Sequence, residues 1–122
     1  MGLDVYLEKA TATKKECFHC GSFYKEYEIL FEANITHNLG EMASRAGIYE
    51  ACWRPEEINA KKAKDIIPYL EKGLAALKKD KLYFEKFNAK NGWGIYEHFV
   101  PWVERYLEAC RTYPNSIIRT SL

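Results

Sequence analysis

The chain has 122 residues, and this length predicts one domain, residues 1–122, with no room for a second of ordinary size. Apolar residues make up 48% and charged residues 29%, which predicts a folded domain and not a disordered or membrane protein. With 18 basic and 17 acidic residues the net charge is +1, so the basic excess of a nucleic-acid binder is missing and no nucleic-acid polymer is expected as a partner.

The N-terminal residues predict an intracellular protein. They lack the positive segment and the long apolar segment of a signal peptide, and no apolar run approaches the length of a membrane span. We therefore expect no membrane association. In such a location the four cysteines are expected to be thiols or metal ligands and not disulfides.

Two strands are predicted at the start of the chain. Aliphatic and polar residues alternate over residues 2–8, as in a strand with one apolar face. The polar stretch 9–22 is expected to form a loop or the arm of a hairpin. Residues 23–32 are enriched in Tyr, Ile and Phe and predict a second strand.

Helical spacing begins near Asn34. The apolar residues Ile35, Leu39, Met42 and Ala46 recur at the period of a helix and predict one buried stripe. Residues 48–53 are expected to continue as a turn or short helix.

A further short helix is expected to start with Pro55 at its first position, and Asn59 is expected to cap the helix after it. Residues 60–79 carry the clearest helical pattern, with a kink or a break expected at Pro68. Asp80 is expected to cap a short helix over the next residues.

The C-terminal part predicts a turn, a helix and a strand. Residues 88–94 are rich in turn formers, and the last helix is expected to run from Ile95 or Pro101 to Arg111. Residues 116–121 complete the pattern as a strand.

The order strand–strand–helix–helix–helix–strand predicts an α+β domain. We expect the short first and last strands to pair with each other, or with the second strand, in one antiparallel sheet of about three strands. Helices would cover one face of this sheet, and the face with Asp4, Tyr6 and Glu8 would meet solvent or another subunit. Because a small sheet leaves an open edge, a homo-oligomer is expected.

Cys17 and Cys20 form a CxxC motif followed by Gly21, the form of a zinc knuckle. A structural zinc site needs four ligands, and no second CxxC or HxxxH pair exists in the sequence. His19, Cys52, His98 or Cys110 would have to complete the site. The alternative is a pair of ordinary loop cysteines without a cofactor, open to oxidation.

The segment Asn34-Ile35-Thr36-His37-Asn38 is the most prominent polar cluster. On a helix, the polar residues Asn34, Asn38, Glu41 and Arg45 would form a stripe about 90° from the apolar one, with His37 nearly opposite the core. Two readings remain open. The stripe is either a capped, solvated helix face or a row of donors and acceptors beside a cleft that binds a small polar molecule.

Aromatic residues next to arginine or glycine are further candidates. Trp53 and Arg54 adjoin at a helix boundary, Trp93 stands between two glycines, and Trp102 and Arg105 share a helix face. Tryptophan can stack on a base, and arginine can pair with a phosphate. Core packing is the alternative for each tryptophan, and Trp93 fits that alternative least well.

Catalytic motifs are missing. The chain has no GxSxG, Walker, GxGxxG or HExxH pattern. Asp4 and His37 could form an orienting pair if the first strand abuts the helix, and this is the only argument for an enzyme.

Several segments resemble small proteins encoded by tailed phages and prophages: MGLDVYL (1–7), NITHNL (34–39), MA (42–43), AGIY (46–49), WRP (53–55), NGWG (91–94) and YLEA (106–109). The resemblance implies a phage accessory protein that acts in the cytoplasm of a bacterial host. That family has no settled activity and supplies no catalytic residues, and the stretch from Cys17 to Cys20 is not part of its pattern.

Three functions follow in order of preference. The first is binding of a small polar, nucleotide-like ligand, used to counter host defence. Its candidate residues are Asn34, His37, Asn38, Arg45, Trp53, Arg54 and Trp93. The second is an inhibitor or adaptor that binds a host protein through its surplus of aromatic residues. The third is a nucleotide hydrolase that uses His37 and Asp4.

Overall fold

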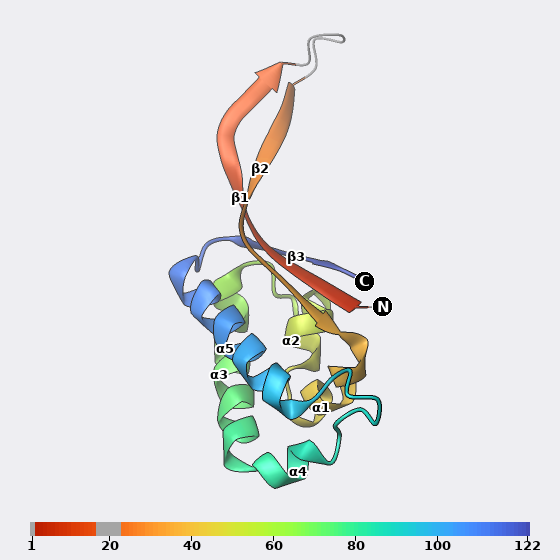
Figure 1. Cartoon of the computed structure of the whole chain (residues 1–122). Helices are drawn as coiled ribbons and strands as arrows, with labels where there is room; N and C mark the ends of the chain where they lie inside the picture. Colours follow the sequence, from red (N-terminus) through yellow and green to blue (C-terminus); the bar gives the residue numbers. More distant parts are fainter. Residues whose placement is uncertain (1, 17–22) are drawn as a thin grey trace.

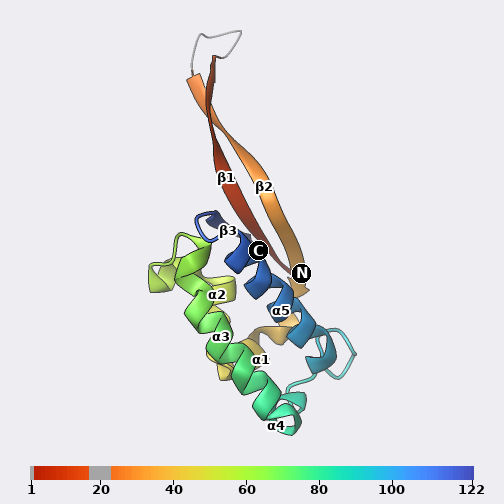
Figure 2. The same ribbon diagram turned by 90° about the vertical axis from the view of Figure 1, so that its left-hand side faces the viewer.

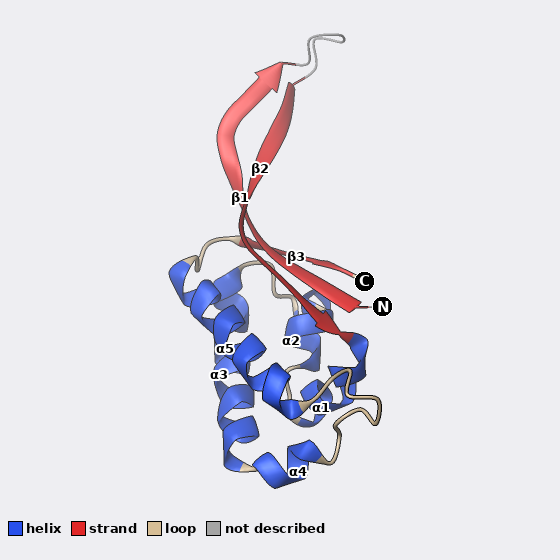
Figure 3. Cartoon of the chain, viewed as in Figure 1, coloured by secondary structure: helices blue, strands red, loops and turns tan. Residues whose placement is uncertain are grey.

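The computed structural model describes residues 2–16 and 23–122 and has an α+β fold. Its three strands are β1 (Gly2–Glu16), β2 (Phe23–Thr36) and β3 (Ile117–Ser121), which form one antiparallel sheet in the order β2-β1-β3. The first and last strands pair with each other, which was one of the two predicted arrangements, and Val5 lies opposite Thr120. Helices gather on one side of this sheet (Figures 1 and 3).

The first two strands are longer than the sequence predicted. They pair along their length from Gly2 and Thr36 to Glu16 and Phe23, with two shifts in register. β3 pairs only with the part of β1 from Asp4 to Glu8. The outer part of the hairpin therefore projects beyond the helices as a two-stranded ribbon, as both views show (Figures 1 and 2).

The helical part follows β2 and ends before β3. It contains two 3₁₀ helices and five α-helices, counted over the described residues. In chain order these are η1 (His37–Leu39), α1 (Gly40–Arg45), α2 (Tyr49–Trp53), η2 (Pro55–Ile58), α3 (Ala63–Lys79), α4 (Lys81–Glu85) and α5 (Tyr96–Thr112). The short helices predicted over residues 48–53 and from Pro55 are present as α2 and η2. Helix α5 starts at Tyr96, one residue after the earlier of its two predicted starts.

The predicted helix from Asn34 is wrong at its start. Asn34 and Ile35 still belong to β2, where they face Asp4 and Leu3 across the strands, and an α-helix begins only at Gly40. The four residues of the predicted stripe are nevertheless all buried: Ile35, Leu39, Met42 and Ala46. A strand, a 3₁₀ turn and a short helix thus bury the residues that the sequence had placed on one helix.

Three smaller predictions about helix ends also need correction. Asn59 caps no helix start and instead ends η2 with a left-handed φ of 58°, which asparagine tolerates better than most residues. Pro68 lies inside α3 without breaking it. Asp80 precedes α4, but its side chain makes no capping hydrogen bond.

The core lies between the inner face of the sheet and the helices. Leu3, Val5 and Leu7 point inward from β1 and are fully buried, and α5 contributes the largest buried aromatic side chains, among them Phe99 and Tyr106. Burial of side chains of this size is the main source of stability for a domain this small.

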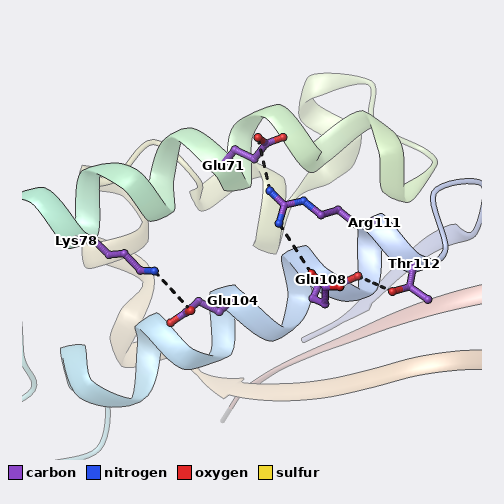
Figure 4. A network of polar contacts seen from close by, with 6 residues as sticks. All are labelled: Glu71, Lys78, Glu104, Glu108, Arg111 and Thr112. Atoms are coloured by element: carbon purple, nitrogen blue, oxygen red, sulfur yellow. Dashed lines mark hydrogen bonds and ion pairs between the residues drawn. The ribbon is translucent and has the colours of Figure 1, made fainter.

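Helices α3 and α5 run antiparallel beneath the sheet, and ion pairs join them at their exposed sides (Figure 4). Lys78 lies 3.6 Å from Glu104, and Arg111 lies 3.6 Å from Glu71. All four side chains are about half exposed, so these pairs contribute little to the free energy of unfolding. No helix within the described residues has the length and apolar character of a membrane crossing.

Candidate functional site

A cavity of about 660 Å³ opens where the end of β2 meets the loop before α5. We call it the Trp93 cavity. This volume falls within the roughly 300–1,000 Å³ of pockets that bind small molecules. The cavity is lined by Gly2, Asn34, Ile35, Thr36, Leu39, Gly92, Trp93, Gly94 and His98.

The Trp93 side chain is exposed, although two hydrogen bonds hold its backbone and a third closes its loop. Trp93 as a whole residue is 72% exposed. The Trp93 amide donates to Asn91 Oδ1 at 3.0 Å, and the Asn38 side-chain amide donates to the Trp93 carbonyl at 2.7 Å. The Ala89 amide closes the loop with a 2.9 Å bond to the Gly94 carbonyl. The cavity therefore has a large aromatic surface at a defined position and with no partner of its own among the described residues.

Gly94 allows this loop to approach η1 and β2. Its φ of 111° is a conformation that side chains disfavour, and a Cβ atom there would lie 2.9 Å from Asn38 Cβ and 3.1 Å from Thr36 Cγ2. The sequence pattern of a tryptophan between two glycines thus has a structural reason, because the loop must pack closely against the residues that hold it.

The Asn34 side chain has a fixed orientation at the cavity wall. Its Nδ2 donates to Asp4 Oδ1 at 2.7 Å and to the Leu3 carbonyl at 3.3 Å. Because both partners are acceptors, the amide nitrogen must face them, and both of its hydrogens are used. The Oδ1 atom of Asn34 is then the part of this amide that can accept a hydrogen bond from a ligand.

His37 and Trp53 form a structural pair away from the cavity lining. The Trp53 indole donates to His37 Nδ1 at 3.1 Å, and the Trp53 ring, which is only 2% exposed, stacks on Tyr49 with 5.4 Å between ring centres. Trp53 is therefore a core residue and offers no surface to a ligand. His37 is half-buried and does not lie opposite the core as the helical projection predicted.

The two candidate arginines also lie outside the cavity lining. Arg45 is exposed, stands 3.8 Å from Glu41, and places its guanidinium 5.5 Å from the centre of the Phe87 ring. Arg54 is exposed between α2 and η2. Neither arginine provides a positive charge at the cavity wall.

Of the seven predicted binding residues, the structure places Asn34 and Trp93 in the cavity wall and Asn38 directly behind the loop. His37, Arg45, Trp53 and Arg54 lie elsewhere. The sequence interpretation missed Thr36 and His98 as wall residues. A signal for His98 existed, because it follows the glycine-flanked tryptophan by five residues and lies in the first turn of the next helix.

The described residues do not form the catalytic pair that the enzyme hypothesis required. Asp4 Oδ1 accepts from Asn34, whereas His37 Nδ1 accepts from Trp53, and no hydrogen bond within the described part of the chain joins Asp4 to His37.

The two cysteines within the described residues are not reactive thiols. Cys52 and Cys110 are buried thiols. Burial raises the pKa of Cys52, with a further contribution from Cys110, and burial raises the pKa of Cys110 to about 12. Both are therefore neutral and poor nucleophiles near pH 7. The predicted zinc ligands Cys17 and Cys20 lie outside the described residues, and the remainder contains no group of three side chains suited to a metal.

Comparison of the chain with protein-family models, with curated proteins and with solved structures finds no match in any of the three.

Proposed function

We propose that this protein binds a small polar ligand with a planar ring, of the nucleotide-like class, in the Trp93 cavity. The observation that carries the proposal is the indole of Trp93, a residue that is 72% exposed on a loop whose backbone is held by hydrogen bonds. An exposed tryptophan keeps a large apolar surface in water. A partner that covers this surface would gain the free energy of its burial. A flat ring that stacks on the indole would provide that partner.

The surroundings of Trp93 favour a ligand of small size. The wall combines apolar side chains from Ile35 and Leu39 with a few polar groups, among them Asn34, Thr36 and His98. Small-molecule sites commonly have this composition, in which the apolar wall excludes water and the polar groups set the orientation. The fixed amide of Asn34 limits the entropy that binding would cost.

Calorimetric titration with nucleosides, nucleotides and cyclic nucleotides tests the proposal. Replacing Trp93 by alanine is expected to weaken binding by roughly 5- to 150-fold, because stacking of a base on an aromatic residue contributes about 1–3 kcal/mol. Tyr69→Ala is the matched control, since Tyr69 is 42% exposed on α3 and does not line the cavity. Absence of binding to the whole panel, or equal binding by the Trp93 variant, contradicts the proposal.

A biological role follows from the resemblance to phage proteins. A phage accessory protein in the cytoplasm of a bacterial host could counter host defence by sequestering a nucleotide-like signal. This role rests on the resemblance and on the binding proposal together.

A protein partner is the second candidate, and exposed apolar side chains elsewhere on the surface favour it. Leu82 and Tyr83 on α4 are 82% and 39% exposed. Co-purification from host lysate tests it: a stoichiometric partner that is lost with Leu82→Ser supports this function, and a partner lost only with Trp93→Ala places docking at the Trp93 cavity instead.

A further inference from the structure

We infer that the exposed surface of residues 78–90, which we call the α4 surface, docks on an acidic region of a partner protein. The inference rests on the second candidate function, binding of a protein partner, and names the chemistry of that partner. Three features carry it: an exposed leucine beside an aromatic cluster, lysines around that leucine, and a position at one end of the molecule.

The apolar centre of the α4 surface is Leu82. At 82%, no large apolar residue among the described ones is more exposed. The ring of its neighbour Tyr83 meets Phe84 and Phe87 edge-on, with 5.1 and 5.3 Å between ring centres. Because Phe84 is buried, this aromatic cluster fixes α4 to the core. Leu82 is thus presented on a fixed helix, so its burial by a partner would cost little ordering of the backbone.

Lysines surround this apolar centre. Residues 78–90 contain five lysines and two acidic residues, so the segment carries a net charge of +3 in a chain whose total is +1. Of the two acidic residues, Asp80 is exposed and Glu85 is half-buried. Among the described side chains, Lys78 is the one lysine of the segment with an acidic partner, Glu104 at 3.6 Å. All five lysines are exposed: Lys78, Lys79, Lys81, Lys86 and Lys90. Carboxylates of a partner would therefore meet a net positive charge here.

The position of the α4 surface leaves it accessible to a large partner. In both views α4 lies at the end of the helical part that is remote from the hairpin (Figures 1 and 2). None of residues 78–90 lines the Trp93 cavity, so docking here does not compete with a ligand there. An apolar centre inside a charged rim is the usual anatomy of a protein interface.

An acidic protein fits this surface better than other anionic partners do. A nucleic acid offers phosphates and flat bases, but it has no pocket for an aliphatic side chain such as Leu82. A lipid bilayer would take up one large aliphatic side chain from the segment, and even a single myristoyl chain binds a bilayer only marginally. A protein pocket that accepts leucine and is rimmed by carboxylates uses both the apolar centre and the lysines.

Titration of the ¹⁵N-labelled protein with two designed peptides tests the inference. Both peptides are amphipathic helices with leucines along one face, and the opposite face carries glutamates in one peptide and lysines in the other. We expect the glutamate peptide to shift the amide signals of residues 78–90, whereas the lysine peptide should leave them in place. High salt should weaken binding of the glutamate peptide, because it screens exposed charges.

Two sets of variants separate the roles of charge and of the leucine. Lys81→Glu combined with Lys86→Glu is expected to weaken binding of the glutamate peptide about tenfold or more, because attraction becomes repulsion. The matched control is Lys64→Glu combined with Lys72→Glu, which changes the net charge equally at exposed positions of α3 outside the α4 surface. Leu82→Ser should also weaken binding roughly tenfold, since burial of a leucine is lost.

Several results would overturn the inference. These are the absence of any shift with the glutamate peptide, shifts confined to other parts of the chain, equal binding of both peptides, and equal losses in the two double variants. Binding of phosphatidylglycerol vesicles or of a single-stranded oligonucleotide without binding of the glutamate peptide assigns the surface to another class of partner and overturns it as well. A partner from host lysate that depends on Leu82 but not on Lys81 and Lys86 overturns this inference alone and leaves the second candidate function standing.

Discussion

Two tyrosines on α5 place the same hydroxyl group in opposite situations. The Tyr96 hydroxyl donates to the Leu77 carbonyl at 2.7 Å, whereas the Tyr106 hydroxyl is buried with no hydrogen-bond partner among the described residues. Burial raises the pKa of Tyr106 well above its usual value, and the Cys110 and Cys52 thiols add to this effect. A buried hydroxyl without a hydrogen-bond partner lowers the free energy of unfolding, whereas a hydrogen bond to the hydroxyl offsets this loss.

Replacing each tyrosine by phenylalanine is therefore expected to have opposite effects. Tyr106→Phe should leave the free energy of unfolding unchanged or raise it, because the change removes only an unpartnered group. Tyr96→Phe should lower it by about 1 kcal/mol, because the Leu77 carbonyl loses its donor. Urea denaturation of both variants measures the difference, and a larger loss for Tyr106→Phe than for Tyr96→Phe would refute this interpretation.

The hydrogen bond between Trp53 and His37 gives a second prediction for single residues. Removing His37 leaves a buried indole N–H without a partner, so His37→Ala is expected to cost about 1–3 kcal/mol of unfolding free energy. His98→Ala is the matched control, since His98 is exposed. In a variant that already has Trp53→Phe, the cost of His37→Ala should fall markedly. Equal costs in the two backgrounds would show that the bond contributes nothing.

At the scale of elements, α3 begins with a capping carboxylate that can be tested by pH. Asp65 Oδ2 accepts from the Lys62 and Lys61 amides at 3.0 and 3.1 Å. These two hydrogen bonds lower the pKa of Asp65. A carboxyl group with a depressed pKa in the folded state stabilises that state above its unfolded pKa, and the contribution is lost as the pH falls through the folded value.

Asp65→Ala is accordingly expected to cost about 1 kcal/mol at pH 7, the usual contribution of a helix cap. The difference from wild type should begin to shrink as the pH falls below about 4, the ordinary pKa of an unfolded aspartate, and should vanish as the pH falls through the lower folded pKa of Asp65. Thermal or urea unfolding across this pH range measures it. Asp80→Ala serves as the control, because Asp80 precedes α4 without a capping bond. A difference that stays constant down to pH 2 would contradict the role given to the charge.

The elements that the sequence predicted correctly are those whose signals are local. The alternation over the first strand, proline at the start of η2 and the apolar face of α3 all act within a few residues. The start of the predicted helix at Asn34 failed because β1 pairs with residues 34–36, a contact between residues about 30 positions apart that no local pattern reveals.

The position of Pro68 explains why α3 continues through it without the break that was one of the two predicted outcomes. It is the sixth residue of α3, so the carbonyl that its missing N–H leaves without a donor belongs to Lys64 in the first turn. Lys64 is exposed, and water can bond that carbonyl. The proline therefore affects only a carbonyl in the first turn of α3, and the helix continues beyond it.

At the scale of the molecule, the sequence identified part of the candidate site for a sound reason. The glycines around Trp93 indicated a loop with an exposed ring, and the structure has such a loop. The helical projection suggested Arg45, and the adjacent pair of an aromatic residue and an arginine suggested Trp53 and Arg54. Where these side chains lie depends on packing between distant parts of the chain, which a local pattern does not reveal. His98 joins the wall for the same reason, since the loop returns to the end of β2.

The edges of the sheet bear on the predicted homo-oligomer. The outer edge of β3 is partly covered, because Ile118 bonds to the Lys61 carbonyl and Ile117 forms a bridge with Lys62. The outer edge of β2 has no strand beside it within the described sheet. An open edge of this kind favours pairing with another chain. Light scattering should accordingly give twice the mass of 14.2 kDa or more, and a monomer at all concentrations would contradict it.

The central claim is that Trp93 forms the wall of a ligand site, and the three tryptophans allow a direct test. In a ¹⁵N-labelled sample each indole N–H gives its own NMR signal, which the single Trp→Phe variants assign. Trp93 is exposed, whereas Trp53 and Trp102 are each 2% exposed. Addition of adenosine should shift the Trp93 indole signal and leave the other two in place. Saturating adenosine that leaves the Trp93 signal unmoved, or that moves only Trp53 or Trp102, would contradict the account.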